Sequence, residues 1–157
     1  MPAPDASPQD IDRVAAELAE CLPALHRALD RRIGQDFPHS KPSEGQLSLL
    51  RLVAEREGVT VREAAGALLM KPNNVSALVS QLTGQGLLER RQDASDKRVA
   101  HLYLTALARQ RLAEAGRIAD AHIAQALRTL TDGQLDALGS ALGALTALTR
   151  QLHAAAG

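Results

Sequence analysis

One segment of two-residue periodicity, between residues 87 and 104, interrupts a sequence that is otherwise patterned for helices. In VAHLYL (99–104) the side chains alternate between two faces, and the polar stretch QDASDK separates this run from LLERR (87–91). Alternation is typical of half-buried strands, and two such runs joined by a polar turn predict a hairpin. The chain must therefore build a fold in which helices surround one small β-element.

The starts of the helices are marked by capping signals. A Ser or Thr followed three residues later by Gln or Glu predicts a reciprocal cap, and this pattern begins at Ser43, Thr60 and Thr131. Ser7 opens a looser version, and Pro72 suits a first helical turn. These signals predict five helix starts, and a sixth follows at residue 105, where the spacing becomes helical again.

The ends of the helices are marked by glycine. Gly34, Gly58 and Gly84 each follow a periodic apolar run, and we expect each to end a helix in the left-handed conformation. The predicted helices span residues 8–33, 44–57, 60–69, 72–84, 105–128 and 131–153.

This order predicts a mainly α fold in a single domain, 1–157. Three short helices and the hairpin form a winged helix-turn-helix over 44–104. Long helices flank it over 8–40 and 105–153, and each carries an apolar stripe at helical spacing. We expect these stripes to pack against a second copy of the chain, although packing within one chain remains the alternative. The residues expected to form the dimer are Ile11, Val14, Leu18, Leu138, Leu142, Leu145, Leu148 and Leu152.

Charge and aromatic content restrict the class of partner. The net charge is zero, yet residues 61–104 hold six basic against four acidic side chains, and four of the six cations lie within residues 90–98. Any surface for nucleic acid is therefore expected there. Phe37 and Tyr103 are the only aromatic residues, which excludes the base-stacking platforms of proteins that bind single strands. Double-stranded DNA is the nucleic acid that fits.

Three stretches resemble the MarR (multiple antibiotic resistance regulator) family. They are PSEGQLSLLRLV (42–53), TVREAAGALLMKPNNVSALVSQLTGQGLLERR (60–91) and DASDKRVAHLYLT (93–105). The third is the most specific, since it combines two aspartates, an arginine and an alternating strand. The resemblance implies a homodimeric regulator, most often a repressor, that binds a roughly palindromic operator and is released by a small effector.

The resemblance also implies which residues meet DNA. Residues at the start of the 72–84 helix would face base edges and phosphates, although Asn73 and Asn74 would equally serve as ordinary helix caps. Arg98 would enter a narrow minor groove, with Asp96 holding its guanidinium. The expected DNA-binding residues are Lys71, Pro72, Asn73, Asn74, Ser76, Ala77, Gln81, Arg90, Arg91, Asp96, Lys97 and Arg98.

The recognition helix departs from the family in one respect. Many members carry arginines where this chain has Ala77 and Gln81, and the helix contains no cation, with only Lys71 beside it. We therefore expect the wing to supply most of the electrostatic attraction to phosphate. A winged helix that binds protein instead of DNA is the alternative that this departure leaves open.

Members of the family often bind amphipathic or phenolic molecules where the dimer helices meet the DNA-binding lobe. The corresponding residues also suit an ordinary transition from core to surface. The residues expected at this effector site are His26, Leu29, Ile33, Phe37, His39, Leu47 and Arg51.

Other functions find little support in the sequence. Cys21 occupies the region where redox-sensing members keep a reactive thiol, but it has no tyrosine or cation nearby, so we expect it only to fill space in the packing, and a cysteine-based sensor remains the alternative. The histidines lack metal-ligand spacing, and no catalytic motif is present, so we expect no metal, no cofactor and no enzymatic activity. Without a signal peptide or membrane span, a cytoplasmic location is expected.

Overall fold

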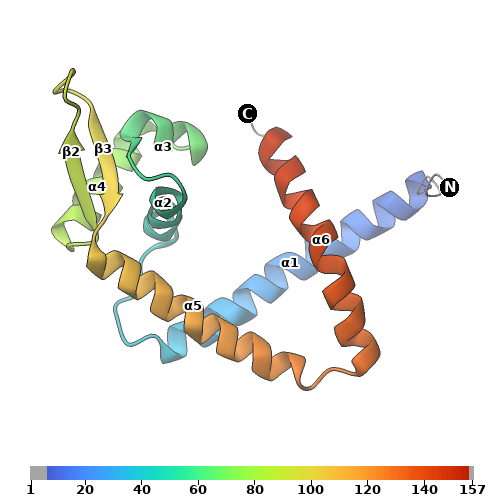
Figure 1. Cartoon of the computed structure of the whole chain (residues 1–157). Helices are drawn as coiled ribbons and strands as arrows, with labels where there is room; N and C mark the ends of the chain where they lie inside the picture. The colour runs from blue at the N-terminus through green and yellow to red at the C-terminus, as the bar shows by residue number, and fades with distance from the viewer. Residues whose placement is uncertain (1–6, 156–157) are drawn as a thin grey trace. The chain divides into compact units, whose positions relative to one another are not determined.

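The computed structural model describes residues 7–155, and its elements alternate largely as predicted (Figure 1). The elements are α1 (Pro8–Asp36), α2 (Glu44–Glu55), β1 (Val59–Thr60), α3 (Val61–Ala67), α4 (Pro72–Gly84), β2 (Leu88–Gln92), β3 (Ala100–Leu104), α5 (Ala106–Leu127) and α6 (Asp132–Ala155). The mainly α fold and the winged helix-turn-helix are confirmed.

The predicted capping boxes start their helices. Ser43 Oγ accepts a bond from the Gln46 N–H at 3.2 Å, and Gln46 Oε1 accepts one from the Ser43 N–H at 3.0 Å. The same reciprocal pair forms between Thr60 and Glu63, and the bonds from Thr60 lower the pKa of the Glu63 carboxyl. Because these bonds span only three residues, the sequence alone was sufficient to place the helix starts.

Two of the three glycine predictions are wrong. Gly58 is left-handed as expected, with φ of 80°, but Gly34 lies inside α1 and Gly84 is the last residue of α4. The left-handed residue after α4 is Gly86, with φ of 71°. There the Leu87 N–H reaches back to the Leu82 carbonyl at 2.9 Å, which is the bond of a Schellman ending. The helices thus continue beyond the last apolar residue of each pattern.

The wing belongs to a three-stranded antiparallel sheet with the order β1-β3-β2. The hairpin strands β2 and β3 were predicted, and Arg91 lies opposite His101 in their register. Strand β1 was not predicted: it pairs Val59 with Leu102 and Thr60 with His101. With two residues, one of them also the cap of α3, β1 is too short to show periodicity.

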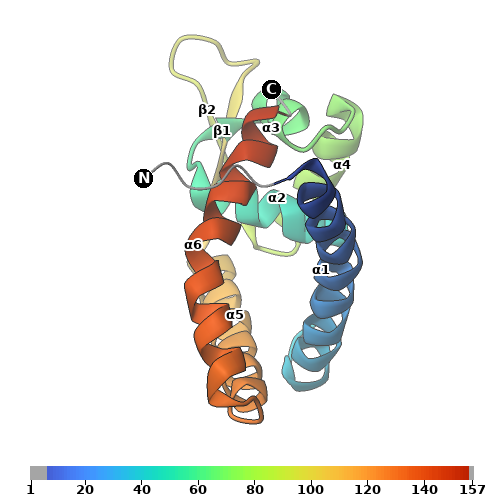
Figure 2. The ribbon, with the colours of Figure 1, turned by 90° about the vertical axis from the view of Figure 1, so that its right-hand side faces the viewer.

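The chain divides into two compact units. One, which we call the lobe, consists of residues 30–118, and the other, the helical unit, consists of residues 1–29 and 119–157. In the lobe, α2 and α4 pack against each other and against the sheet, while α3 packs against α4, as both views show (Figures 1 and 2). The largest fully buried side chains form the core of the lobe: Leu49, Val53, Val75, Val79, Leu82 and Leu102.

The helical unit has a different character. None of its described residues is buried, and many of its large apolar side chains are exposed. An apolar groove of about 620 Å³ runs along it, lined by Ile11, Val14, Leu18 and Leu22 of α1 with Leu148 and Leu152 of α6, among others. Across the described part of the chain, no helix combines the length and apolar character needed to cross a bilayer.

Candidate nucleic-acid interface

The start of α4 presents polar side chains over an apolar base. Val75 and Val79 are fully buried, so the helix is anchored in the core of the lobe, while Asn73, Asn74 and Ser76 are exposed. The cap position is Lys71, whose side chain makes no capping bond, and Pro72 occupies the first turn. The interpretation of the asparagines as caps is therefore wrong. Their amide groups are left facing outward at the positive end of the helix.

Gln81, further along α4, is oriented by a residue that the sequence analysis did not identify. The side-chain amide of Gln46 in α2 donates to Gln81 Oε1 at 3.0 Å, and Gln46 is the one buried polar residue of the described chain. This bond uses the acceptor of Gln81 and leaves its amide N–H groups for a partner. Gln46 also completes the cap of α2, so one side chain ties two helices together.

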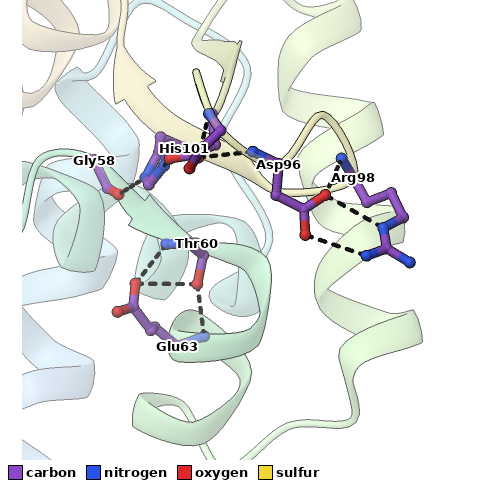
Figure 3. A network of polar contacts seen from close by, with 8 residues as sticks. Gly58, Thr60, Glu63, Asp96, Arg98 and His101 are labelled. Carbon is purple, nitrogen blue, oxygen red and sulfur yellow. Dashed lines mark hydrogen bonds and ion pairs between the residues drawn. The ribbon is translucent and has the colours of Figure 1, made fainter.

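The tip of the wing holds an exposed arginine in a fixed position (Figure 3). Asp96 Oδ1 accepts from the Arg98 backbone N–H at 3.0 Å and from Arg98 Nε at 3.2 Å. The Arg98 side chain is nevertheless 91% exposed. The proposed role of Asp96 in holding the guanidinium thus matches the geometry.

The loop of the wing is organised by Asp93, which directly follows β2. Its Oδ2 accepts from the Ser95 N–H and hydroxyl at 3.0 and 2.6 Å and from the Asp96 N–H at 3.0 Å, while its Oδ1 lies 2.8 Å from His101 Nε2. These bonds hold the pKa of the Asp93 carboxyl far below its usual range. Asp93 therefore joins the wing loop and His101 of β3 into one hydrogen-bond network.

The remaining wing cations differ in whether they form an ion pair within the chain. Arg91 pairs with Glu89 at 3.3 Å, its guanidinium lies 4.3 Å above the Tyr103 ring, and the pairing raises the Arg91 pKa. Arg90 and Lys97 are exposed and form no ion pair with any described residue. A phosphate contact from Arg91 stays a prediction, and it would require the guanidinium to be shared with Glu89.

The residues expected at an effector site fall in both units. His26 and Leu29 belong to the helical unit, and the other five belong to the lobe. Within the lobe, the rings of Phe37 and His39 meet edge to face at 5.1 Å, and His39 Nε2 lies 2.9 Å from Glu114 Oε2. Glu114 was not identified from the sequence, because it lies on α5, 75 residues away.

Comparisons with known proteins agree with this geometry. Residues 41–99 match the model of the MarR family. Over this segment the chain is similar to the MarR family. A comparison with curated protein sequences found no match.

Solved structures of similar fold cover nearly the whole chain. A putative transcriptional regulator from Pseudomonas aeruginosa has a TM-score of 0.76 at 24% identity, covering 92% of this chain and 98% of its own. A MarR family protein from Bacillus stearothermophilus has a TM-score of 0.71 at 19% identity, covering 88% and 97%. FabT from Streptococcus pneumoniae, solved in complex with DNA, has a TM-score of 0.65 at 19% identity, covering 91% and 99%. At these identities the likeness shows the shared fold.

Proposed function

We propose that this protein is a MarR-type transcription regulator, a homodimeric repressor that binds a roughly palindromic site in double-stranded DNA. The observation that carries the proposal is Arg98. The hairpin projects it, Asp96 orients it, and 91% of its side chain is exposed, so its charge is available to an outside partner. A narrow A·T minor groove concentrates negative potential and attracts such an arginine.

The start of α4 supports base readout in the major groove. The outward amides of Asn73 and Asn74 have the donor and acceptor pair that matches the edge of adenine. Because α4 carries no cation, attraction to the DNA backbone would come from Lys71, Arg90 and Lys97, whose side chains are exposed. Direct readout and backbone attraction are thus assigned to different elements.

Arg98→Ala tests the proposed DNA contact. We expect a loss of about 1–3 kcal/mol of binding free energy per half-site and a weaker preference for A·T-flanked duplexes. Lys97→Ala is the matched control: as a phosphate contact, it should weaken all duplexes about equally. Fluorescence anisotropy with A·T- and G·C-flanked duplexes at several salt concentrations measures both effects. Unchanged affinity of Arg98→Ala on both duplexes would exclude DNA reading by the wing.

The symmetry of the operator tests the dimer. If the exposed stripes of α1 and α6 join two copies by a two-fold axis, the half-sites must be inverted and lie about 10 bp apart centre to centre. Selection of binding sites from random duplexes by the purified protein would reveal this arrangement. A direct repeat would contradict it.

The proposed effector is a small amphipathic or phenolic molecule that binds beside Phe37 and His39. The ring of Phe37 offers an apolar edge, and the pair of His39 with Glu114 offers polar groups next to it. Titrating a hydroxybenzoate into the DNA complex should release the DNA from the wild type and less readily from Phe37→Ala. Equal release from both proteins would place the effector elsewhere.

A further inference from the structure

We propose that His101 is a positioning residue for the DNA-binding wing, which it holds in place only when both of its ring nitrogens carry a proton. The effect on DNA affinity rests on the function proposed above, whereas the effect on the wing does not. The prediction is that the protein binds DNA more tightly when His101 is charged than when it is neutral.

The two partners of the imidazole ring carry the argument. Nδ1 lies 2.7 Å from the Gly58 carbonyl oxygen, and Nε2 lies 2.8 Å from Asp93 Oδ1 (Figure 3). A carbonyl oxygen only accepts, and an ionised carboxylate only accepts. A neutral imidazole has one N–H and can satisfy one of them, whereas the imidazolium donates to both. The geometry therefore selects the charged form.

The position of Gly58 makes this arrangement specific. Gly58 has a φ of 80°, its carbonyl oxygen lies beside the ring, and its own N–H donates to the Leu102 carbonyl at 2.9 Å. The imidazolium thus joins the loop before β1 to the loop after β2. Losing one proton from the ring therefore removes one of these two hydrogen bonds.

A short chain of bonds leads from His101 to the arginine at the tip. Asp93 accepts from His101 with one oxygen and from the backbone N–H groups of Ser95 and Asp96 with the other. Asp96 in turn accepts from the backbone and side chain of Arg98. The Asp93 N–H also donates to the Val99 carbonyl at 2.9 Å, which closes the turn. The proton on His101 is therefore two side chains away from Arg98.

The two carboxylates near His101 also favour its charged form. Asp93 faces it from the wing loop, and Glu63 acts on it from the start of α3. Arg91, its partner on β2, is directed to Glu89 and Tyr103, and Arg56 at the end of α2 acts on Glu63. The bonds to Asp93 and Gly58 raise the pKa of His101 above its ordinary value.

The direction of the pH effect follows from this shift. A group whose pKa is higher in the folded state stabilises the fold below its unfolded pKa and loses that effect as pH rises through the folded value. The attachment should be complete at about pH 6 and weaken above the ordinary histidine pKa of about 6.5. Both side chains are about 30% exposed, so solvent screens part of the interaction.

Nuclear magnetic resonance on the full-length protein without DNA tests the wing. We expect the His101 ring to titrate above the ordinary histidine pKa of about 6.5, and the amides of Ser95, Asp96 and Arg98 to shift with the midpoint of His101. Asp93→Asn should lower that midpoint toward the ordinary value. If the wing amides do not follow His101, or if its midpoint lies at the ordinary value, the proposal is overturned.

Anisotropy with one duplex at pH 6 and pH 8.5 tests the effect on DNA. We expect the wild type to bind about three- to tenfold more weakly at the higher pH, the range that corresponds to the net loss of one ordinary hydrogen bond. His101→Gln should lose most of this dependence, and His153→Gln should retain it. The same pH dependence in His101→Gln would overturn the link to DNA. No binding at either pH would reject the proposed function, while the resonance titration would still decide the role of His101.

Discussion

The lobe and the helical unit use their large apolar side chains in opposite ways. In the lobe, Leu49, Leu82 and Leu102 are completely buried among other side chains of the same chain. In the helical unit, Leu142 and Leu152 remain 61% and 64% exposed, on a helix without a single buried residue. One unit has completed its core, and the other has left its apolar surface uncovered.

The difference in exposure indicates which unit would bury apolar surface against a second copy of the chain. Exposed apolar surface costs roughly 25 cal/mol per Å² relative to its burial, and soluble proteins rarely leave large patches of it uncovered. The core of the lobe is already buried within one chain, so the lobe has less to gain by association. The groove along α1 and α6 is lined almost wholly by apolar side chains, so a second copy placing its own stripes there would recover that free energy. We therefore propose that the dimer interface lies on the helical unit.

The largest expected effect comes from charging the helical unit. Leu142→Asp combined with Leu145→Asp should convert a dimer into a monomer or an unfolded chain, because burying two carboxylates in an apolar interface costs several kcal/mol, on the order of 3–5. Light scattering at micromolar concentration measures the mass.

Leu69→Asp in the lobe is the matched control for this pair. Leu69 is 80% exposed, and its φ of 53° is one that Asp tolerates, so the dimer should persist. A wild-type protein that is already monomeric would remove the contrast between the two units.

The next largest effect is expected from truncating a side chain in the core of the lobe. Leu49→Ala removes a fully buried side chain and should lower the free energy of unfolding by about 2–5 kcal/mol. Leu138→Ala replaces an exposed leucine of α6 and should instead lower stability by weakening the association of two copies. Denaturant melts at several protein concentrations separate them, because the midpoint of a dimer rises with protein concentration: Leu49→Ala should keep this dependence, and Leu138→Ala should lose it where the dimer dissociates before unfolding. A dependence in Leu138→Ala as strong as in the wild type would argue against an interface on α6.

Gly58→Ala should have an intermediate effect confined to the lobe. An added Cβ would lie 3.1 Å from the Tyr103 hydroxyl oxygen, and a φ of 80° is strained for alanine. We expect a loss of about 1–3 kcal/mol of unfolding free energy and a weakened attachment of His101 to the Gly58 carbonyl. Thermal melts and the titration of His101 would both respond. Wild-type stability would show that the loop accommodates a side chain without strain.

The smallest expected effect is a gain in stability. Gly34 lies inside α1, and an added Cβ there would meet nothing within 4 Å. Gly34→Ala should therefore raise the free energy of unfolding by about 0.5–1 kcal/mol, since glycine is a poor residue within a helix. If the substitution destabilises the protein, the left-handed helix end first expected at this position would be the better description.

The order of helices, the capping boxes at Ser43 and Thr60 and the wing hairpin could all be predicted from the sequence. The glycine at the end of α4 was misplaced because the apolar pattern stops before the backbone hydrogen bonds do. Strand β1 was missed because two residues show no period. In the candidate interface, the exposed arginine at the tip and its aspartate could be predicted from a motif of three residues, DKR.

The sequence by itself determined what depends on neighbours two to four residues apart, namely helix starts, apolar stripes and the ion pair at the wing tip. Tertiary structure decided which distant polar groups meet. Gln46 reaches Gln81 across 35 residues, and His101 reaches the Gly58 carbonyl across 43. Such bonds require two segments to be held within about 3 Å by the packing of the whole lobe. No local pattern encodes that distance, because the same residues in an unfolded chain would bond to water instead.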